Sequence, residues 1–381
     1  MRIVLLPGDG IGPEVVGAAE RALAAIAGAF NQQFDFEPHP IGGAALAAGL
    51  PPLPAPTLEA CLRADAILLG AVGDPRFDRE PPPRRPERGL LDLRKALGAY
   101  ANLRPTRLWP GLESFSPLKP EVVTGTDFVV VRELTGGLYY GEPRGFLADA
   151  AVNTMRYSSA EVERIARVAF AEARRRRRHV VSVDKANVLE VSQLWRAVVS
   201  HVAEEYPDVR LDHMYVDNCA MQIALKPTQF DVILTENLFG DVLSDEAGAI
   251  AGSLGLLPSA SLGNGPGLFE PVHGSAPALA GRDVANPIGA IASAAMLLRY
   301  GLKLEEEAAA LEGACESALA AGARTTDLGG DARCSDVTAA ILGAIRPSRS
   351  LPGSAADRHR SPAESRCDTP AAGAAPPSAR A

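Results

Sequence analysis

The sequence predicts an α/β protein with a largely parallel, mixed β-sheet. Short apolar runs alternate along the chain with amphipathic segments of ten or more residues, a pattern typical of strands joined by crossover helices. The 381 residues are enough to bury a large core, and 47% of them are apolar. No run reaches the roughly 18 apolar residues that a membrane-spanning helix requires. A soluble enzyme of one or two domains is therefore expected.

The strands and helices are expected in alternation. Apolar runs predict strands at 2–7, 34–41, 66–72, 127–134, 179–186, 209–217 and 231–236. Pro13 suits the first turn of a helix that runs to about residue 28, and a second helix is expected from Thr57. Ser158 and Glu161 have the spacing of a capping box at the start of a third helix. Further helices are expected over 189–206 and 287–300.

Charge and cysteine content narrow the class of protein. The formal net charge of −8 argues against a general nucleic-acid binder. The five arginines at 174–178 end a predicted helix, where cations favour the helix dipole, so a solvated helix end is expected. Five cysteines without CxxC or Cys/His spacing indicate reduced, structural thiols. The first apolar run is too short for a secretory signal, which predicts a cytoplasmic protein.

The C-terminal segment 346–381 differs from the rest in composition. It is rich in serine, alanine, proline and arginine and contains few large apolar residues. Such a segment cannot bury enough apolar surface to fold alone, so a disordered tail is predicted.

A glycine-rich turn follows the first predicted strand. The segment GDGIGPE at 8–14 resembles a dinucleotide-binding loop, but its glycines are spaced G-x-G-x-G instead of G-x-G-x-x-G. Pro13 occupies the position of the third glycine and has no N–H to offer a phosphate. The segment is therefore interpreted as a tight turn between strand and helix, and a Rossmann domain is not predicted.

Three arginines are candidates for binding carboxylates. Arg132 ends an apolar strand, where a buried charge must be paired, while Arg94 and Arg104 lie ten residues apart upstream. Guanidinium groups bind carboxylates bidentately, so three of them would suit a dicarboxylate or tricarboxylate. Ordinary surface salt bridges are the alternative. The surface salt bridge is favoured for Arg94 taken alone, whereas a functional role is favoured for Arg132.

Lys185 and three aspartates are candidates for catalysis and metal binding. Lys185 follows a predicted strand, where partial burial would lower its pKa enough for it to act as a base; a lysine leaning into solvent is an equal alternative. Asp217 is placed at the end of another strand, and Asp241 and Asp245 lie one helical turn apart. A cation such as Mg²⁺ or Mn²⁺ would relieve their repulsion, and a solvated acidic face is the alternative.

Six motifs together resemble those of the isocitrate/isopropylmalate family of β-decarboxylating dehydrogenases. They are GDGIGPE, LRKALGAYANLRP, VRELTGGLYYGEPRG, VDKANVL, FGDVLSD and FEPVHGSAP, and they occur in the family's order between Arg2 and about Ile345. The resemblance implies a cofactor-binding domain of residues 1–99 plus 252–345 and a substrate, metal and dimerisation domain of residues 100–251. It also implies a homodimer with active sites shared between subunits, no nucleic acid and no membrane partner.

The resemblance further implies a role for each matching residue. Arg94, Arg104 and Arg132 would hold the substrate carboxylates, and Leu90 with Leu91 would form an apolar wall for an isopropyl group. Asp241 and Asp245 would bind Mg²⁺ or Mn²⁺ together with the partner's Asp217, which would also contact the substrate. The partner's Lys185 would take the substrate's hydroxyl proton, and Tyr139 would protonate the product enol. NAD would be bound by Glu87, His273, Gly274, Ser275, Ala276, Pro277, Ala278 and Asn286.

The implied reaction is the NAD-dependent oxidation and decarboxylation of 3-isopropylmalate in leucine biosynthesis. Members that use NAD usually carry an acid after HGSAP, whereas this chain has Ala278 there, which weakens the expected discrimination against NADP. Tartrate, D-malate or homoisocitrate would be the substrate of a sibling enzyme. A catalytically silent carboxylate-binding protein is the alternative from another class.

Overall fold

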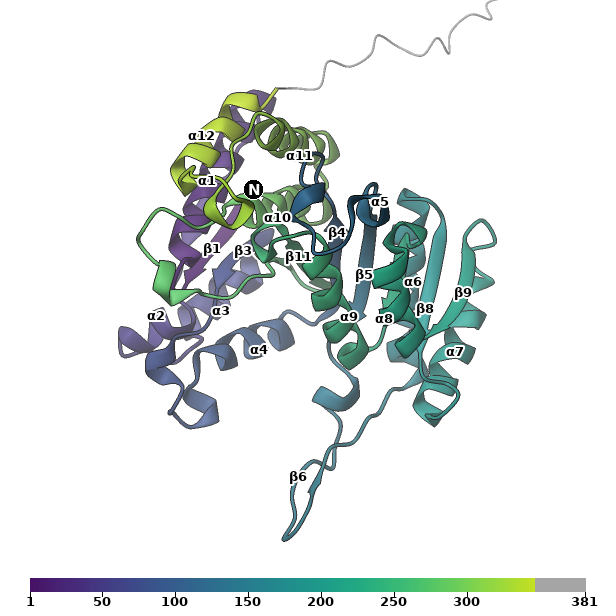
Figure 1. The fold of residues 1–381 in the computed structure, drawn as a ribbon. Helices are drawn as coiled ribbons and strands as arrows, with labels where there is room; N and C mark the ends of the chain where they lie inside the picture. The colour runs from purple at the N-terminus through teal and green to yellow at the C-terminus, as the bar shows by residue number, and fades with distance from the viewer. Residues whose placement is uncertain (347–381) are drawn as a thin grey trace, which may run out of the picture. The chain divides into compact units, whose positions relative to one another are not determined.

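A ten-stranded mixed sheet forms the centre of the protein in a computed structural model that describes residues 1–346 (Figure 1). Across the sheet the strands lie in the order β2-β1-β3-β12-β11-β4-β5-β10-β8-β9. Their bounds are Arg2–Gly8 (β1), Asp35–Pro38 (β2), Ala66–Ala71 (β3), Ala99–Arg107 (β4), Asp127–Glu133 (β5), His179–Asp184 (β8), Arg210–Tyr215 (β9), Val232–Thr235 (β10), Pro258–Gly263 (β11) and Gly267–Pro271 (β12).

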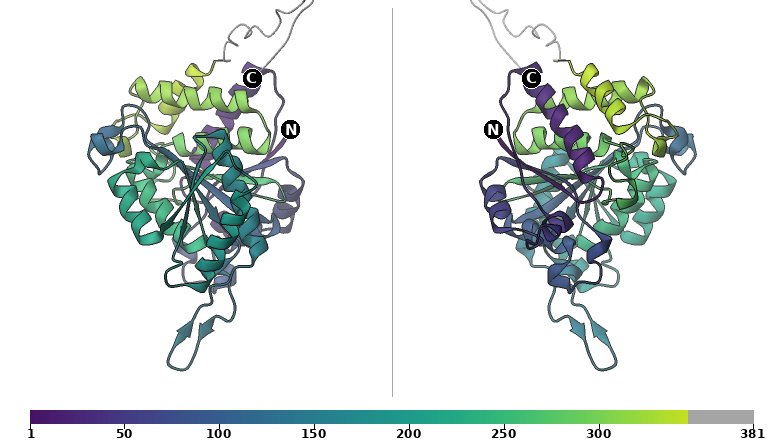
Figure 2. Two further views of the ribbon diagram at one scale, coloured as in Figure 1. Left: turned by 90° about the vertical axis from the view of Figure 1, so that its right-hand side faces the viewer. Right: turned by 90° about the vertical axis from the view of Figure 1, so that its left-hand side faces the viewer.

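Helices cover both faces of this sheet (Figures 1 and 2). Alternate side chains of a strand point to opposite faces, so Ile3 and Leu5 of β1 enter one apolar core while Val4 and Leu6 enter another. The helices are Gly12–Phe30 (α1), Gly42–Ala47 (α2), Ala55–Arg63 (α3), Pro86–Ala96 (α4), Pro120–Val123 (α5), Ser159–Arg175 (α6), Glu190–Ala203 (α7), Val216–Leu225 (α8), Asn237–Ile250 (α9), Ile288–Met296 (α10), Glu305–Ala320 (α11) and Cys334–Ala344 (α12).

The two faces carry different helices. Helices α1, α6, α7, α10, α11 and α12 contribute to the core on the Ile3 face. Helices α3 and α4, and farther along the sheet α8 and α9, pack on the opposite face. Side chains that alternate along a central strand therefore contact different sets of helices on the two faces.

Strand direction confirms a largely parallel, mixed sheet that is not a Rossmann domain. Strands β2, β1, β3 and β12 are parallel, and so are β5, β10, β8 and β9. Between these groups, β11 is antiparallel to both β12 and β4, and β4 is antiparallel to β5. The strands from residues 2–71 and 258–271 therefore lie together at one side of the sheet, and those from residues 99–235 at the other.

All seven predicted strands are present, whereas β4, β11 and β12 were not predicted. These three strands contain proline, glycine, asparagine or arginine, which hide the apolar pattern on which the prediction relied. The capping box of Ser158 and Glu161 is confirmed at the start of α6. Pro13 lies in the first turn of α1, also as predicted.

One sequence-based placement is wrong, and a second is correct only in part. Asp217 does not end a strand; β9 stops at Tyr215 and Asp217 lies in the first turn of α8. The arginine run is not uniformly solvated, because α6 ends at Arg175 and the Arg176 side chain turns inward. It pairs with Asp127 at 2.8 Å and with the buried Asp231 at 2.9 Å, and both acids lie at strand starts that the sequence did not place beside it.

The opening glycine turn connects distant loops. Gly8 and Gly10 have φ values of 68° and 58°, in the left-handed region that favours glycine. The N–H of Ile11, at the start of α1, donates to the Ser275 carbonyl at 2.8 Å. The buried Asp9 carboxylate accepts N–H groups from Gly43, Ala44 and Gly73 at 2.7–2.8 Å. These contacts give the turn a structural role.

A slender hairpin extends away from the sheet between β5 and α6. Its two short strands, Gly145–Phe146 (β6) and Ala151–Val152 (β7), pair with each other and form a separate two-stranded sheet (Figure 2). Phe146 is 94% exposed and Leu147 is 62% exposed. Such apolar exposure marks the hairpin as a contact surface.

The expectation of reduced, structural cysteines agrees with the structure. Cys61, Cys219, Cys315 and Cys334 are buried free thiols, and burial raises the pKa of Cys61, Cys219 and Cys334 to about 12. No helix within residues 1–346 is long and apolar enough to cross a membrane. Cys367 and, apart from Arg346, the predicted disordered tail lie outside the described residues.

Replacing Gly10 by alanine tests the strain of the opening turn. A Cβ at Gly10 would lie 1.9 Å from the Ser275 carbonyl oxygen, in addition to the unfavourable φ. We expect Gly10→Ala to lower the free energy of unfolding by about 3 kcal/mol. In the control Gly28→Ala, on α1, no atom lies within 4 Å of the new Cβ, and we expect stabilisation of about 0.5–1 kcal/mol. Denaturant unfolding of both variants at one protein concentration provides the comparison.

Candidate active site

Several of the predicted site residues line one small cavity. Its volume is about 180 Å³, and it lies between α4, the ends of β3 and β12, and the segment after β12. Leu90 and Arg94 of α4, Arg104 of β4, and His273 with Gly274 contribute to its walls. The carboxyl ends of parallel strands are the usual position of binding sites in α/β sheets. A larger cavity of about 610 Å³ lies elsewhere and contains none of the predicted site residues.

Arg94 enters the cavity from α4 and is held by a residue that the sequence analysis missed. Its Nη2 donates to Glu270 Oε1 at 2.5 Å, and both side chains are largely buried. Burial acts to lower the pKa of Arg94, but the charge of Glu270 and its hydrogen bond raise the pKa overall. Arg94 Nε is buried without a hydrogen-bond partner. The salt bridge of Arg94 is therefore a largely buried one and not a surface pair.

Arg132 is buried at the end of β5, as the functional interpretation required. Its guanidinium forms a salt bridge with Asp241, and its Nη2 donates to Asn237 Oδ1 at 2.8 Å. Burial lowers its pKa; the Asp241 charge opposes this effect, and the charges of Arg104 and Arg94 reinforce it. The three guanidiniums thus influence one another electrostatically, and each is paired with a carboxylate of the site.

Arg104 lies between the two aspartates of α9. Its Nη1 donates to Asp245 Oδ1 at 3.0 Å and to Ser244 Oγ at 2.8 Å, and its Nη2 is 3.9 Å from Asp241 Oδ1. Asp241 and Asp245 lie on one face of α9, as predicted. Arg104 already supplies the positive charge between them, so their repulsion is not evidence for a cation.

Tyr139 completes the cluster around Asp241. It lies in the turn after β5, and its hydroxyl donates to Asp241 Oδ2 at 2.8 Å. Partial burial, followed by the hydrogen bond and charge of Asp241, raises the pKa of Tyr139 above its usual value of 10.0. The phenol is therefore protonated at neutral pH and can donate a proton.

Lys185 and Asp217 form a second polar group, separate from this cluster. Lys185 follows β8, as predicted, and its Nζ donates to Asp217 Oδ1 at 2.7 Å. This hydrogen bond holds the pKa of the Asp217 carboxyl below its usual range. Within residues 1–346 of one chain, no hydrogen bond or salt bridge joins the pair to Asp241 or Asp245.

The segment 273–286 forms a loop over the cavity. His273 is half-buried, and loss of solvent around its ring lowers its pKa; its buried Nε2 has no hydrogen-bond partner within residues 1–346. Ala276 has a φ of 39° and precedes a short turn at Pro277–Leu279 that places Ala278 on the surface. Across the cavity entrance, a Cβ built on Gly73 would lie 3.4 Å from Glu87 Oε1 and 3.5 Å from Ser275 Oγ. Glu87 and Ser275 therefore face the same space.

Two residues are placed differently from the expectation. The Asn286 side chain accepts from the Ile288 N–H and donates to Asp327, both at 3.0 Å, so it is occupied at the start of α10. Leu91 is 44% exposed and does not line the cavity, because adjacent residues of a helix point about 100° apart. Of the two leucines, Leu90 lines the cavity, as do the apolar Ala71, Val72 and Val272.

Three polar residues of the site were missed by the sequence analysis. Glu270 holds Arg94, Asn237 holds Arg132, and Asn102 Oδ1 accepts from Arg104 Nε at 2.9 Å. Each is buried. Glu270 and Asn102 lie within quoted motifs, in strands that were not predicted. Their burial beside the arginines could have been inferred from the sequence only if those strands had been predicted first.

Comparisons with known proteins match nearly the whole described chain. The profile of the family described as isocitrate/isopropylmalate dehydrogenase matches residues 2–341. The 3-isopropylmalate dehydrogenase of Gloeobacter violaceus is 58% identical over 86% of this chain and 92% of its own length. The 3-isopropylmalate dehydrogenase of Aquifex aeolicus is 54% identical over 86% of this chain and 91% of its own length.

Solved structures agree with the sequence matches. The isocitrate dehydrogenase of Methylococcus capsulatus has a TM-score of 0.79 at 35% identity and covers 91% of this chain and 99% of its own. A β-decarboxylating dehydrogenase of Thermococcus kodakarensis in its apo form has a TM-score of 0.77 at 40% identity, covering 90% and 96%. At these identities the likeness extends beyond the fold.

Proposed function

The chain belongs to the isocitrate/isopropylmalate dehydrogenase family, and from this premise we propose that it oxidises and decarboxylates (2R,3S)-3-isopropylmalate to 4-methyl-2-oxopentanoate in leucine biosynthesis. The reaction would depend on NAD and a divalent metal ion. The observation that carries the proposal is the cavity that places Arg94 and Arg104 beside the apolar Leu90. The names of the relatives at 54–58% identity support the same reaction.

The substrate would bind through its carboxylates and its branched group. Arg94 and Arg104 line the cavity, and Arg132 lies near enough for their charges to affect its pKa. Guanidiniums are suited to a malate skeleton, which carries two carboxylates. Leu90 would contact the isopropyl group, since a polar residue would be expected there for a substrate with a third carboxylate. This arrangement favours isopropylmalate over isocitrate.

The donor set fits a hard divalent cation. Asp241 and Asp245 present carboxylate oxygens on one face of α9, the ligand type that Mg²⁺ and Mn²⁺ prefer. Asp217 of the partner subunit would complete the site. When bound, such an ion acts as a Lewis acid that stabilises negative charge on the substrate as CO₂ leaves. As the complex forms, Arg104 and Arg132 would release Asp245 and Asp241 and bind the substrate carboxylates instead.

Proton transfers are assigned to Lys185 and Tyr139. The partner's Lys185 would accept the proton of the substrate hydroxyl as hydride leaves C2 for the nicotinamide. Tyr139 would then protonate the enol that remains after decarboxylation, and its raised pKa keeps that proton available at neutral pH. Asp241, which accepts the Tyr139 hydroxyl at 2.8 Å, would hold the phenol in position.

The cofactor would lie along the loop 273–286, with Glu87 near the nicotinamide. His273, Gly274 and Ser275 line or face the cavity, and Ala276, Pro277 and Ala278 form the turn beside it. The Asn286 side-chain amide is already hydrogen-bonded to Asp327 and to the Ile288 N–H, so Asn286 would contribute to cofactor binding by fixing the start of α10. We favour NAD over NADP, although Ala278 lacks the carboxylate that would repel a 2′-phosphate.

A homodimer would supply Lys185 and Asp217 to the other subunit's site. Apolar side chains are exposed on α8 and α9, where Met221 is 53%, Leu225 is 62% and Val242 is 60% exposed. Figure 1 shows these helices side by side on one face of the sheet. Covering this surface with a second copy would bury it and bring the two polar groups together.

The domain division is proposed on the same basis. Residues 1–99 plus 252–345 would form the cofactor-binding domain, and residues 100–251 the substrate, metal and dimerisation domain. The grouping of strands on either side of the β11–β4 pair supports this division. Sibling activities on tartrate, D-malate or homoisocitrate and a silent carboxylate-binding role are the competing functions.

The central experiment measures NADH formation from 3-isopropylmalate with and without Mg²⁺ or Mn²⁺. We expect metal-dependent turnover, with tartrate, D-malate and homoisocitrate as poorer substrates. Asp241→Asn should lower kcat by about 100-fold or more, because a ligand and the Tyr139 acceptor are altered together. The control Asp92→Asn removes an exposed carboxylate that pairs with Arg88 on α4 and should leave kcat unchanged. Absence of turnover with every substrate would favour the silent protein.

Cofactor choice can be tested at Ala278. We expect Ala278→Asp to raise the ratio of kcat/KM for NAD to kcat/KM for NADP by about tenfold or more, through repulsion of the 2′-phosphate. Ala280→Asp places the same charge two residues away and serves as the matched control. A wild-type preference for NADP would contradict the cofactor assignment.

Shared active sites predict complementation between inactive variants. Lys185→Ala and Asp241→Asn should each be inactive, and a heterodimer of the two should contain one intact site. Equal mixing with random reassembly gives half heterodimers, so we expect about a quarter of wild-type activity. Recovery should fail if Lys185 and Asp241 of one chain act in the same site.

A further inference from the structure

The larger cavity lies on the face of the sheet opposite the candidate active site. Along β4, Arg104 points into the site cavity, whereas Pro105 and Arg107 line the cavity of about 610 Å³. Residues adjacent in a strand point to opposite faces, which explains the separation. The volume falls within the roughly 300–1,000 Å³ typical of small-molecule sites. No predicted catalytic or cofactor residue reaches this space.

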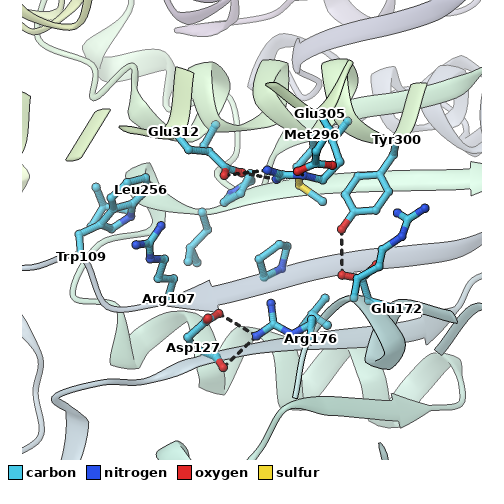
Figure 3. Close-up of a pocket in the computed structure, with 17 residues that line it drawn as sticks. Arg107, Trp109, Asp127, Glu172, Arg176, Leu256, Met296, Tyr300, Glu305 and Glu312 are labelled. Atoms are coloured by element: carbon cyan, nitrogen blue, oxygen red, sulfur yellow. Dashed lines mark hydrogen bonds and ion pairs between the residues drawn. The ribbon is translucent and has the colours of Figure 1, made fainter. Parts of the chain in front are cut away.

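One end of the cavity is apolar and aromatic. Trp109 and Leu256 line it, and each is almost completely buried (Figure 3). The guanidinium of Arg107 lies 5.2 Å from the centre of the Trp109 ring. An apolar group of a ligand would be shielded from water at this end.

Most of the charged groups around the cavity are already neutralised. Arg299 pairs with Glu305 and Glu312, Arg176 with Asp127, and Arg107 with Glu316. These salt bridges leave little unbalanced charge above and below the cavity, where Figure 3 shows the Glu312 and Asp127 carboxylates. A ligand must therefore be recognised by other groups.

Two charged residues of α6 lack such partners among the described residues. Glu172 is 7% exposed and makes no salt bridge there; its Oε1 accepts the Tyr300 hydroxyl at 2.9 Å. Burial and the Glu172 charge raise the pKa of Tyr300, so its hydroxyl stays protonated and orients the carboxylate. Arg175, three residues later at the cavity rim, lies over the Tyr300 ring and also forms no salt bridge within residues 1–346.

We propose that this cavity binds an α-amino acid with an apolar side chain. The ammonium would pair with Glu172, which is otherwise a buried carboxylate with a single hydrogen bond, and the carboxylate with Arg175. Figure 3 shows Glu172 and Tyr300 at one end and Trp109 and Leu256 at the other, so the side chain would extend along the cavity toward them. The arrangement matches a zwitterion in both charge and polarity.

The ligand would contact both of the proposed domains. Trp109, Glu172 and Arg175 belong to residues 100–251, whereas Leu256, Met296 and Tyr300 belong to residues 252–345. The site itself is independent of the reaction, since it uses none of the residues assigned to catalysis. Its test therefore measures binding and does not depend on the proposed function.

Calorimetric titration of the full-length protein with L-leucine as the probe tests the proposal. We expect a Kd of about 1 mM or tighter, a range accessible to a ligand of this size. Glycine lacks the apolar side chain, 3-methylbutylamine lacks the carboxylate and 4-methylpentanoate lacks the ammonium. Each should bind at least about tenfold more weakly, because each loses one of the three contacts.

Variants locate the binding. Glu172→Gln and Arg175→Gln should each weaken L-leucine binding by about tenfold or more. Arg174→Gln is the matched control, because Arg174 pairs with Asp208 on the outer surface of α6. Arg104→Gln removes a guanidinium of the candidate active site and should leave binding unchanged. Arg175 is exposed, so its variant remains informative if Glu172→Gln does not fold.

Three results would overturn the proposal. They are the absence of a binding signal at 10 mM L-leucine (about tenfold above the expected Kd), equal affinity in wild type and Arg175→Gln, and loss of binding in Arg104→Gln. The last result would show that L-leucine occupies the candidate active site instead.

Discussion

The pairing of buried guanidiniums with carboxylates is the constraint around which the candidate site is organised. A buried charge without a partner is strongly unfavourable, so each of the three arginines needs an acid nearby. Arg94 uses Glu270, Arg104 uses Asp245, and Arg132 uses Asp241. These pairs join α4 to β12, β4 to α9 and β5 to α9. In the proposed function, ligand carboxylates would replace these acids.

The parts of the fold that could be predicted are those in which a local pattern determines the structure. The capping box at Ser158 and the apolar run before Arg132 gave the correct elements, because capping and strand periodicity act over a few residues. Strands β4, β11 and β12 escaped prediction for the opposite reason. Their stability comes from antiparallel partners far along the chain, which no local pattern reveals.

The candidate site shows the same division. The position of Arg132 after an apolar strand favoured a functional role, Tyr139 was named only through the family resemblance, and the structure brings both onto the carboxylate of Asp241. Asp217 was assigned to a strand, although a helix begins one residue earlier. The GDGIGPE turn was interpreted as a tight turn, yet its contact with Ser275 could be found only in three dimensions. Contacts between residues far apart in sequence can be identified only from the folded structure.

The position of β12 beside β3 has a consequence for synthesis of the chain. Strands β1, β2 and β3 are complete by Ala71, but the parallel neighbour of β3 begins at Gly267. At ribosomal rates of about 5–20 residues per second, the nascent chain carries an unpaired sheet edge for roughly 10–40 seconds. Such an edge can pair with other chains. Until β12 emerges, the first half of the sheet therefore has an open edge at β3.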